Sequence, residues 1–276
     1  MSFQNLFMIH IPKTGGSYVT FKALRHECAT KPKLIREDLE RHGVTNSGPR
    51  RFFTYGHFHC LRETQFDFPH HFNGCYQNYD EYNDSLRFSI VRNPFDVLVS
   101  MYFFRYPYNP VPQNAKLFPD ISWSEFVKTF CNSNEEWLPQ VRSPMKQFMF
   151  FQMFDDEGAC CAHEVLRMET LDDDLVRMCK PLEIEPVKSP RYNTTDHRFI
   201  NRNDAPESGG WSGENGTKLQ GRDPDFRVYY NDELRDLVQK KCQRELDMFG
   251  YSFDGHSSEQ ILPESLRYKF TTDRIL

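Results

Sequence analysis

A strand, a tight turn and a helix follow one another at the N-terminus, and this segment constrains the fold more than any other. The apolar run 6–11 predicts a buried strand. Lys13 leads into Gly15 and Gly16, where backbone N–H groups can approach an anion closely. A helical pattern follows over residues 18–24. Because free amides and the helix dipole both favour negative charge, the segment predicts an α/β fold with a phosphate-binding turn.

The order of residues in this turn differs from that of a Walker A loop. A Walker A loop reads G-x-x-x-x-G-K-[ST], with the lysine after the glycines. Here Lys13 precedes Gly15 and Gly16, and the turn is too short to wrap a triphosphate in the usual way. ATP or GTP bound for Mg²⁺-assisted transfer is therefore not expected. A P-loop kinase or nucleotide hydrolase stays an alternative, as does a plain turn between strand and helix.

A second strand–helix junction carries a basic residue. Residues 87–91 predict a strand, Asn93 is a good N-cap, and Pro94 suits the first helical position. Arg92 follows the strand at its C-terminal end, where ligands bind in open α/β sheets. Ser100 is a hydroxyl within the apolar helix that follows. The junction therefore offers a cation and a hydroxyl donor beside the same sheet edge.

In this order, the two motifs resemble those of the sulfotransferase superfamily, whose members use 3′-phosphoadenosine 5′-phosphosulfate (PAPS) as sulfuryl donor. H-I-P-K-T-G-G at residues 10–16 is similar to the 5′-phosphosulfate loop of the branch with heparan sulfate 2-O-sulfotransferases and bacterial small-molecule sulfotransferases. The resemblance is sharp over 5–25 and 86–104 and diffuse elsewhere. It implies a P-loop-like central parallel sheet flanked by helices, and 3′-phosphoadenosine 5′-phosphate (PAP) as product.

The resemblance also implies roles for single residues. Lys13 would contact the donor's 5′-phosphate and its bridging oxygen, and Arg92 and Ser100 would hold the 3′-phosphate. Arg222 lies in a segment similar to the basic glycine loop over the 3′ side, although an ordinary surface loop explains it equally well. The residues expected to supply amides and hydroxyls around the 5′-phosphate are Thr14, Gly15, Gly16, Ser17 and Tyr18.

Sulfuryl transfer also needs in-line placement of its reactants and a base for the nucleophile. The β-rich run 51–59 contains a Gly-His pair, and in the resembled branch a His after Gly at this strand end is the catalytic base. The resemblance therefore assigns the base to His57, with a structural histidine as the alternative. His59 is expected to be structural or to contact the acceptor, and His10 to pack beside the turn.

Composition restricts the acceptor. The net charge of −5 disfavours nucleic acid and extended polyanions as partners. A small molecule with a hydroxyl or amine, such as an alkaloid of secondary metabolism, is the predicted acceptor. Sulfation of a glycan is the enzymatic alternative, and a non-catalytic nucleotide-binding protein is the other class. The length of 276 residues predicts one sulfotransferase domain over 1–276, with a mobile loop at about 200–224 and a tail at about 255–276.

The cysteine pattern predicts neither zinc binding nor secretion. Eight cysteines occur without a C-x-x-C pair or zinc spacing, so reduced thiols are expected. The N-terminus has no basic n-region, and its apolar run is too short for a signal or a membrane span. We therefore predict a soluble, cytoplasmic protein without a membrane partner. The proposed chemistry requires no metal, and His70 and His71 lack partners at a ligand spacing.

Further elements are predicted downstream. Ser122 and Glu125 have the spacing of a capping box. Residues 164–169 predict a late parallel strand followed by a helix to Cys179, with the acidic residues 172–174 at its N-terminus serving the dipole rather than a metal. Residues 229–249 form an amphipathic helical pattern that Gly250 would end.

Overall fold

The structure is a computed structural model, and its chain divides into two compact units. The first unit draws on Met1–Arg92, Gln147–Tyr192 and Glu259–Leu276, and the second on Asn93–Lys146 and Asn193–Ser258. Each unit is described by itself. The structure describes residues 3, 5–11, 13–27, 52–55, 85–105, 122–132, 153–155, 157–188 and 223–267.

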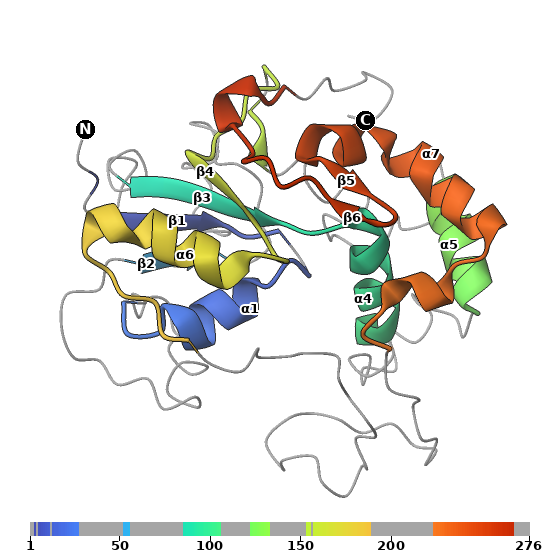
Figure 1. The fold of residues 1–276 in the computed structure, drawn as a ribbon, viewed down its shortest axis with the longest axis horizontal. Coiled ribbons are helices and arrows are strands. Elements are labelled where there is room, and N and C mark those ends of the chain that lie inside the picture. Colours follow the sequence, from blue (N-terminus) through green and yellow to red (C-terminus); the bar gives the residue numbers. More distant parts are fainter. Residues whose placement is uncertain are drawn as a thin grey trace, which may run out of the picture. The chain divides into compact units, whose positions relative to one another are not determined.

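A parallel sheet of four strands forms the centre of the first unit (Figure 1). Its order is β2-β1-β3-β4, and Met8 of β1 lies beside Phe88 of β3, which in turn lies beside Glu164 of β4. The predicted α/β class with a central parallel sheet is confirmed. The strands are β1 (Asn5–Ile9), β2 (Phe52–Tyr55), β3 (Ser85–Val91) and β4 (Glu164–Arg167).

Helices cover one face of this sheet. Side chains alternate along a strand, so one set from β1, β3 and β4 packs against the helices. The opposite set is buried as well, as is usual for parallel sheets. The covering helices are α1 (Gly16–Tyr18), the π-helix η1 (Val19–Ala23), α6 (Leu171–Cys179) and the 3₁₀ turn η5 (Lys180–Leu182). The core between them includes Leu6, Met8, Val19, Leu24, Phe88, Ile90, Leu166, Leu175 and Met178.

The sequence predicted the helix after the first strand, but it did not predict that this helix changes from an α-helix to a π-helix. It begins as α1 and continues as a π turn, in which the Leu24 amide donates to the Val19 carbonyl oxygen at 2.8 Å. Single π turns inside helices occur frequently at functional sites. This one starts directly after Tyr18, at the base of the predicted phosphate-binding turn.

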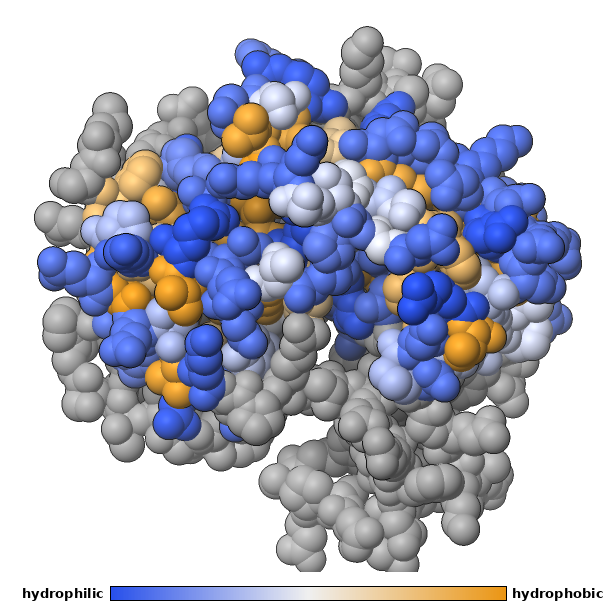
Figure 2. Space-filling view, in the orientation of Figure 1, coloured by the Kyte–Doolittle hydropathy of each residue, from blue (hydrophilic) through white to orange (hydrophobic). Residues whose placement is uncertain are grey.

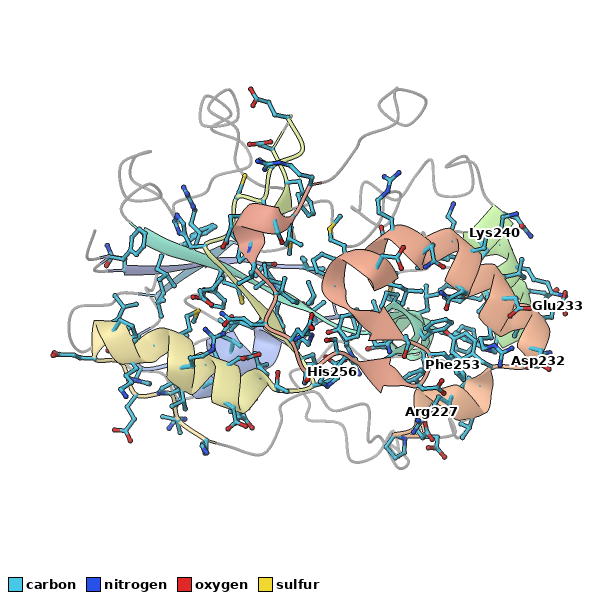
Figure 3. The ribbon with its side chains drawn as sticks, turned by 45° about the horizontal axis from the view of Figure 1, so that its top comes forward. Arg227, Asp232, Glu233, Lys240, Phe253 and His256 are labelled. Atoms are coloured by element: carbon cyan, nitrogen blue, oxygen red, sulfur yellow. The ribbon has the colours of Figure 1, made fainter. Side chains whose placement is uncertain are left out.

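The second unit is built from helices and a short hairpin. It holds α4 (Pro94–Arg105), α5 (Trp123–Asn132), η7 (Phe226–Tyr229), α7 (Asp232–Phe249), β5 (Tyr251–Ser252) and β6 (Gly255–His256). An aromatic cluster joins them: the ring of Phe253, which Figure 3 labels, lies edge-on to Phe95 and to Tyr230, with centroids 5.0 and 5.7 Å away. The Tyr230 hydroxyl donates to the Phe95 carbonyl oxygen at 2.8 Å.

Capping side chains set the helix starts in this unit. The Asn93 side chain accepts from the Phe95 amide at 3.1 Å, as its N-cap prediction requires. Ser122 and Glu125 form the predicted capping box, since each side chain accepts from the other's backbone amide. The C-terminal helix begins at Asp232 rather than at residue 229, because Phe226–Tyr229 forms a 3₁₀ turn and Asn231 caps α7.

The structure describes only part of the predicted C-terminal tail and of the predicted mobile loop. Gly250 has a φ of 66° and ends α7 as expected. Part of the predicted tail is ordered structure: β6 belongs to the second unit, and η8 (Pro263–Ser265) lies in the first between the buried side chains of Ile261 and Leu266. Residues 200–222 of the predicted mobile loop lie outside the described residues. The single-domain assignment stays a prediction.

Hydrophilic residues cover most of the visible surface, with small apolar patches between them (Figure 2). Among the described residues, no helix is both long and apolar enough to cross a membrane. In the described part of the chain, the large apolar side chains that remain exposed are Val176, Val187, Val228 and Leu262.

Candidate functional site

The turn after β1, residues 13–16, has an unusual backbone. Lys13 has a φ of 67° and Gly15 a φ of 100°, both in the left-handed region. Glycine adopts such angles at little cost, whereas a lysine there is uncommon and strained. Strain of this kind persists where the surrounding structure holds it, and it concentrates at functional sites. We call residues 13–16 the donor turn.

Hydroxyl groups near the donor turn already donate inside the protein. The buried Thr14 hydroxyl donates to the Ile11 carbonyl oxygen at 2.9 Å, which closes the turn onto the end of the strand segment. The Tyr18 hydroxyl donates to Oδ1 of Asp172 at 2.7 Å. A hydroxyl has one proton to give. An anion in the turn would therefore be held by backbone N–H groups and cations rather than by these two hydroxyls.

Side chains from other parts of the chain lie very close to both glycines of the donor turn. A Cβ on Gly15 would collide with Sδ of Met168, and a Cβ on Gly16 would collide with the imidazole ring of His10. His10 therefore packs against the turn, as the sequence suggested. The two glycines are needed for different reasons, since Gly15 also has a left-handed φ whereas Gly16 begins α1.

Arg92 joins the two sequence motifs within the first unit. It follows β3, and its Nη1 donates to the Lys13 carbonyl oxygen at 3.1 Å. β1 and β3 are parallel neighbours, so their C-terminal ends meet at one edge of the sheet. The Arg92 guanidinium thus lies at the same end of the sheet as the donor turn, which includes Lys13.

Other predicted site residues are placed elsewhere or not described. Ser100 lies on α4 in the second unit, and only 3% of it is exposed. Ser17 lies in α1. The strand predicted before His57 exists as β2, beside β1. His57, His59, His70, His71 and Arg222 lie outside the described residues.

The start of α6 contacts the helix that follows the donor turn, which the sequence did not indicate. Asp172 accepts from Tyr18, and Asp174 accepts from the Arg167 amide at 3.1 Å and from the Thr170 hydroxyl at 2.8 Å. These carboxylates thus serve hydrogen bonds at the helix start, and the described part of the chain has no cluster suited to a metal. No local pattern predicts a contact between residues 154 positions apart.

His163 lies at the opposite end of the sheet from the donor turn. Its Nδ1 accepts from the Arg87 amide at 3.0 Å, and its ring lies 4.8 Å from that of Phe3. Burial and the Arg87 charge lower the pKa of His163 to about 4. A neutral histidine at the N-terminal end of β4 is a structural residue here, not a base for the donor turn.

The oxidation state of the cysteines differs from the prediction. Cys161 is disulfide-bonded, so the prediction of wholly reduced thiols is wrong. Cys131, Cys160, Cys179 and Cys242 are not disulfide-bonded. Burial raises the pKa of Cys160 to about 11 and that of Cys131 to about 12. Both thiols are therefore poor nucleophiles, because the thiolate is the reactive form.

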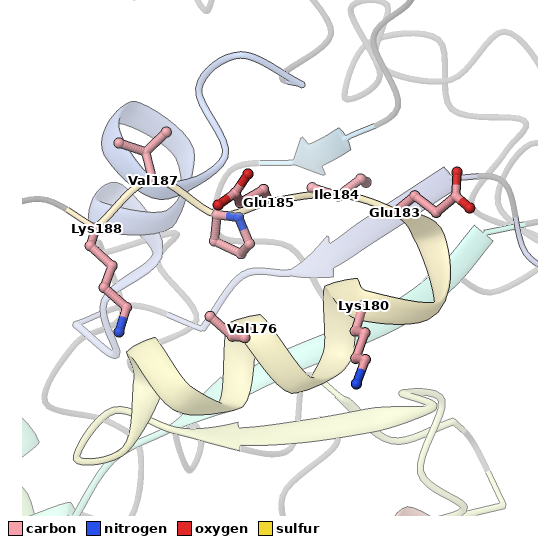
Figure 4. Close-up of a pocket in the computed structure, with 8 residues that line it drawn as sticks. Val176, Lys180, Glu183, Ile184, Glu185, Val187 and Lys188 are labelled. Carbon is pink, nitrogen blue, oxygen red and sulfur yellow. The ribbon is translucent and has the colours of Figure 1, made fainter.

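A shallow pocket of about 760 Å³ lies along α6 and the segment after it (Figure 4). Its lining includes Val176, Lys180, Ile184, Val187 and Lys188. No residue of the donor turn, nor Arg92, lines it. Its mixed charges and open form give no reason to assign it the sulfuryl donor.

Comparison with known proteins identifies the family. A sulfotransferase family model matches residues 2–252. The solved structure of mouse sulfotransferase SULT7A1 complexed with PAP is similar at 15% identity and a TM-score of 0.41, over 87% of this chain and 85% of that one. No curated protein matches. Because the family match spans the sheet, the donor turn and the Arg92 junction, this chain is a member of the sulfotransferase family.

Proposed function

We propose that this sulfotransferase uses PAPS as its donor and transfers the sulfuryl group to a hydroxyl or amine of a small molecule. The observation that carries the donor assignment is the hydrogen bond from Arg92 to the Lys13 carbonyl oxygen. It places the Arg92 guanidinium against the backbone of Lys13, and a donor phosphorylated at both the 5′ and 3′ positions would require a cation for each phosphate. An ordinary ADP-type nucleotide has no 3′-phosphate for the second cation to bind.

The proposed donor contacts follow from charge and backbone geometry. Lys13 would neutralise the 5′-phosphosulfate, and backbone amides of Thr14, Gly15, Gly16 and Ser17 would approach the phosphate oxygens. Arg92 has five N–H donors, and one of them serves the Lys13 carbonyl. Its guanidinium charge suits a 3′-phosphate, with the Ser100 hydroxyl and Arg222 as additional contacts.

The proposed transfer is an in-line displacement at sulfur. His57 removes the proton from the acceptor hydroxyl or amine as that atom forms its bond to sulfur. The bond from sulfur to the bridging oxygen breaks, and PAP leaves with the electron pair. Lys13 stabilises the charge that develops on that oxygen. This scheme needs no redox cofactor and no metal.

The acceptor class is proposed from charge. The chain has a net charge of −5, which opposes a polyanionic acceptor and suits a neutral or cationic natural product such as an alkaloid. Secondary metabolism would then be the setting. The acceptor screen therefore begins with phenols, alcohols and amines of low molecular mass.

A glycan acceptor is the second candidate, and one observation favours it. Disulfides persist mainly in the secretory pathway and outside the cell. The disulfide at Cys161 therefore counts against the proposed cytoplasmic location and makes compartments that build glycans relevant. Sulfate transfer from labelled PAPS to an oligosaccharide, but to none of the small acceptors, would favour this alternative.

The donor assignment is tested by calorimetric titration of the purified chain with PAP and with ADP. Tight binding of PAP and weak binding of ADP are expected, because only PAP carries the 3′-phosphate. Equal affinity for both nucleotides, or no binding of either, would contradict the proposal. Formation of a sulfated product from PAPS would then separate an enzyme from a nucleotide-binding protein.

The base assignment is tested with His57→Ala. Turnover should be lost while the affinity for PAP stays within about twofold of the wild type, because a base acts on the acceptor and not on the donor. His256→Ala, a change at an exposed histidine with no proposed role, serves as the matched control. Undiminished turnover in His57→Ala would reject the assignment.

A further inference from the structure

We propose that Asp172 is a positioning residue for the donor turn, and that it acts through the Tyr18 hydroxyl. The inference rests on the proposed use of PAPS, since it concerns how the donor turn is held for that ligand. It adds a contact from the first turn of α6, which lies outside both sequence motifs.

Tyr18 is tied to the donor turn through its backbone. Its amide donates to the Gly15 carbonyl oxygen at 2.9 Å, and the same oxygen accepts from the Val19 amide at 3.2 Å. Its side chain is 2% exposed, so the ring is fixed by packing as well. A shift of Tyr18 would therefore move Gly15 and the amides around it.

Asp172 is itself firmly placed. It lies in the first turn of α6, directly after Leu171, which is 1% exposed. The same turn is tied to β4, because Asp174 accepts from the Arg167 amide at 3.1 Å. A carboxylate held in this way can fix the Tyr18 hydroxyl, which donates to its Oδ1 at 2.7 Å.

A second contact joins residues 168–171 to the donor turn. Met168 and Leu171 pack against Gly15, so closely that even a methyl group there would meet the Leu171 Cδ2 atom at 3.3 Å. The Met168 amide donates to the Val91 carbonyl oxygen at 2.8 Å, which ties the connection to the end of β3. Met168 and the start of α6 thus support this region at two points, Gly15 in the donor turn and Tyr18 just after it.

The winding of the helix makes the anchor at Tyr18 relevant to binding. Tyr18 is the last residue of α1, and the π turn begins at Val19. Such turns are rare, and the surrounding contacts have to hold them in register. The hydrogen bond to Asp172 thus fixes Tyr18, where α-helical hydrogen bonding changes to the π turn. It thereby fixes the direction of the backbone amides of the donor turn.

The test is calorimetric titration with PAP of the wild type, Tyr18→Phe, Asp172→Ala, their double variant and Asp172→Asn. Tyr18→Phe and Asp172→Ala should each weaken PAP binding about tenfold, the scale of one hydrogen bond to a charged group. The double variant should bind no more weakly than either single variant, because both remove the same bond. Asp172→Asn should stay within about twofold, since an amide oxygen still accepts from the hydroxyl.

Asp173→Ala is the matched control. Asp173 is an exposed residue in the same first turn, so the variant makes the same change of charge without touching Tyr18. It should bind PAP as the wild type does. In steady-state assays, Tyr18→Phe should raise the KM for PAPS and leave the KM for the acceptor unchanged, which a general loss of folded protein would not produce.

The outcomes separate this inference from the donor proposal. Tight PAP binding by the wild type with equal affinity in Tyr18→Phe and Asp172→Ala would overturn the positioning role and leave the donor proposal standing. Additive losses in the double variant would also overturn it, because the two side chains would then act separately. Absence of PAP binding by the wild type would reject both.

Discussion

The Arg92 guanidinium donates to the Lys13 carbonyl oxygen at 3.1 Å, although the two residues are 79 positions apart in the sequence. One side chain therefore holds the backbone of the donor turn and brings its own positive charge to the same place. In a site for a doubly phosphorylated nucleotide, shaping the turn and binding the 3′-phosphate would then depend on the same residue.

Arg92→Ala should weaken PAP binding by at least about tenfold and reduce ADP binding much less, because it removes the cation proposed for the 3′-phosphate. Arg92→Lys should recover only part of the affinity, since one ammonium group lacks the planar fork that serves two partners. Calorimetry with both nucleotides measures the difference. Arg177→Ala, which breaks surface ion pairs of α6 with Glu164 and Asp174, is the control and should bind PAP normally. Equal losses for PAP and ADP in Arg92→Ala would mean that Arg92 only shapes the turn.

Lys13 combines a charge with a strained backbone, so its variants should separate stability from activity. Both Lys13→Ala and Lys13→Gly should lose sulfuryl transfer, but the glycine variant should be more stable than the alanine variant by about 0.5–1 kcal/mol, because only glycine adopts a φ of 67° without strain. Thermal unfolding measures this difference. Glu183 has a φ of 54° and is the matched control. Glu183→Gly should likewise exceed Glu183→Ala in stability, with activity retained in both.

Alanine at Gly16 and at Gly15 should fail for different reasons. In Gly16→Ala the new Cβ collides with the His10 ring, and overpacking of this kind costs about 1–3 kcal/mol. Adding His10→Ala should therefore restore part of the stability. Gly15→Ala also forces alanine to a φ of 100°, so adding Met168→Ala should restore little. Denaturant unfolding of the two single and two double variants measures their stabilities. Equal rescue at both positions would show that the two glycines are needed for the same reason.

Stability should fall as the pH decreases from about 6.5 to about 4. Burial and the Arg87 charge lower the pKa of His163 to about 4 in the folded protein, whereas an unperturbed histidine titrates at 6.5. Between these values the unfolded chain binds more protons, so acid favours unfolding. His163→Gln should flatten the pH dependence of the unfolding midpoint in this window. The same pH dependence in His163→Gln as in the wild type would contradict this assignment.

Local sequence patterns predicted the elements well where short-range physics decides them. The apolar runs that became β1 and β3 lie at the expected positions, and Asn93, Ser122 and Glu125 cap their helices as their spacing implied. Caps and buried strands depend on neighbouring residues, so a local pattern can indicate them. The start of α7 was missed by three positions because a 3₁₀ turn competed with the α-helix there.

The sequence by itself determined the donor turn, the arginine after β3 and the parallel α/β class, because each is encoded in a short strand–turn–helix segment. Only the tertiary structure decided that the hydroxyls of Thr14 and Tyr18 donate to Ile11 and Asp172. It also decided that His10 and Met168 enclose the two glycines and that Cys161 is disulfide-bonded. These contacts depend on which residues packing brings together, and side chains at the ends of parallel strands meet only once the sheet has formed.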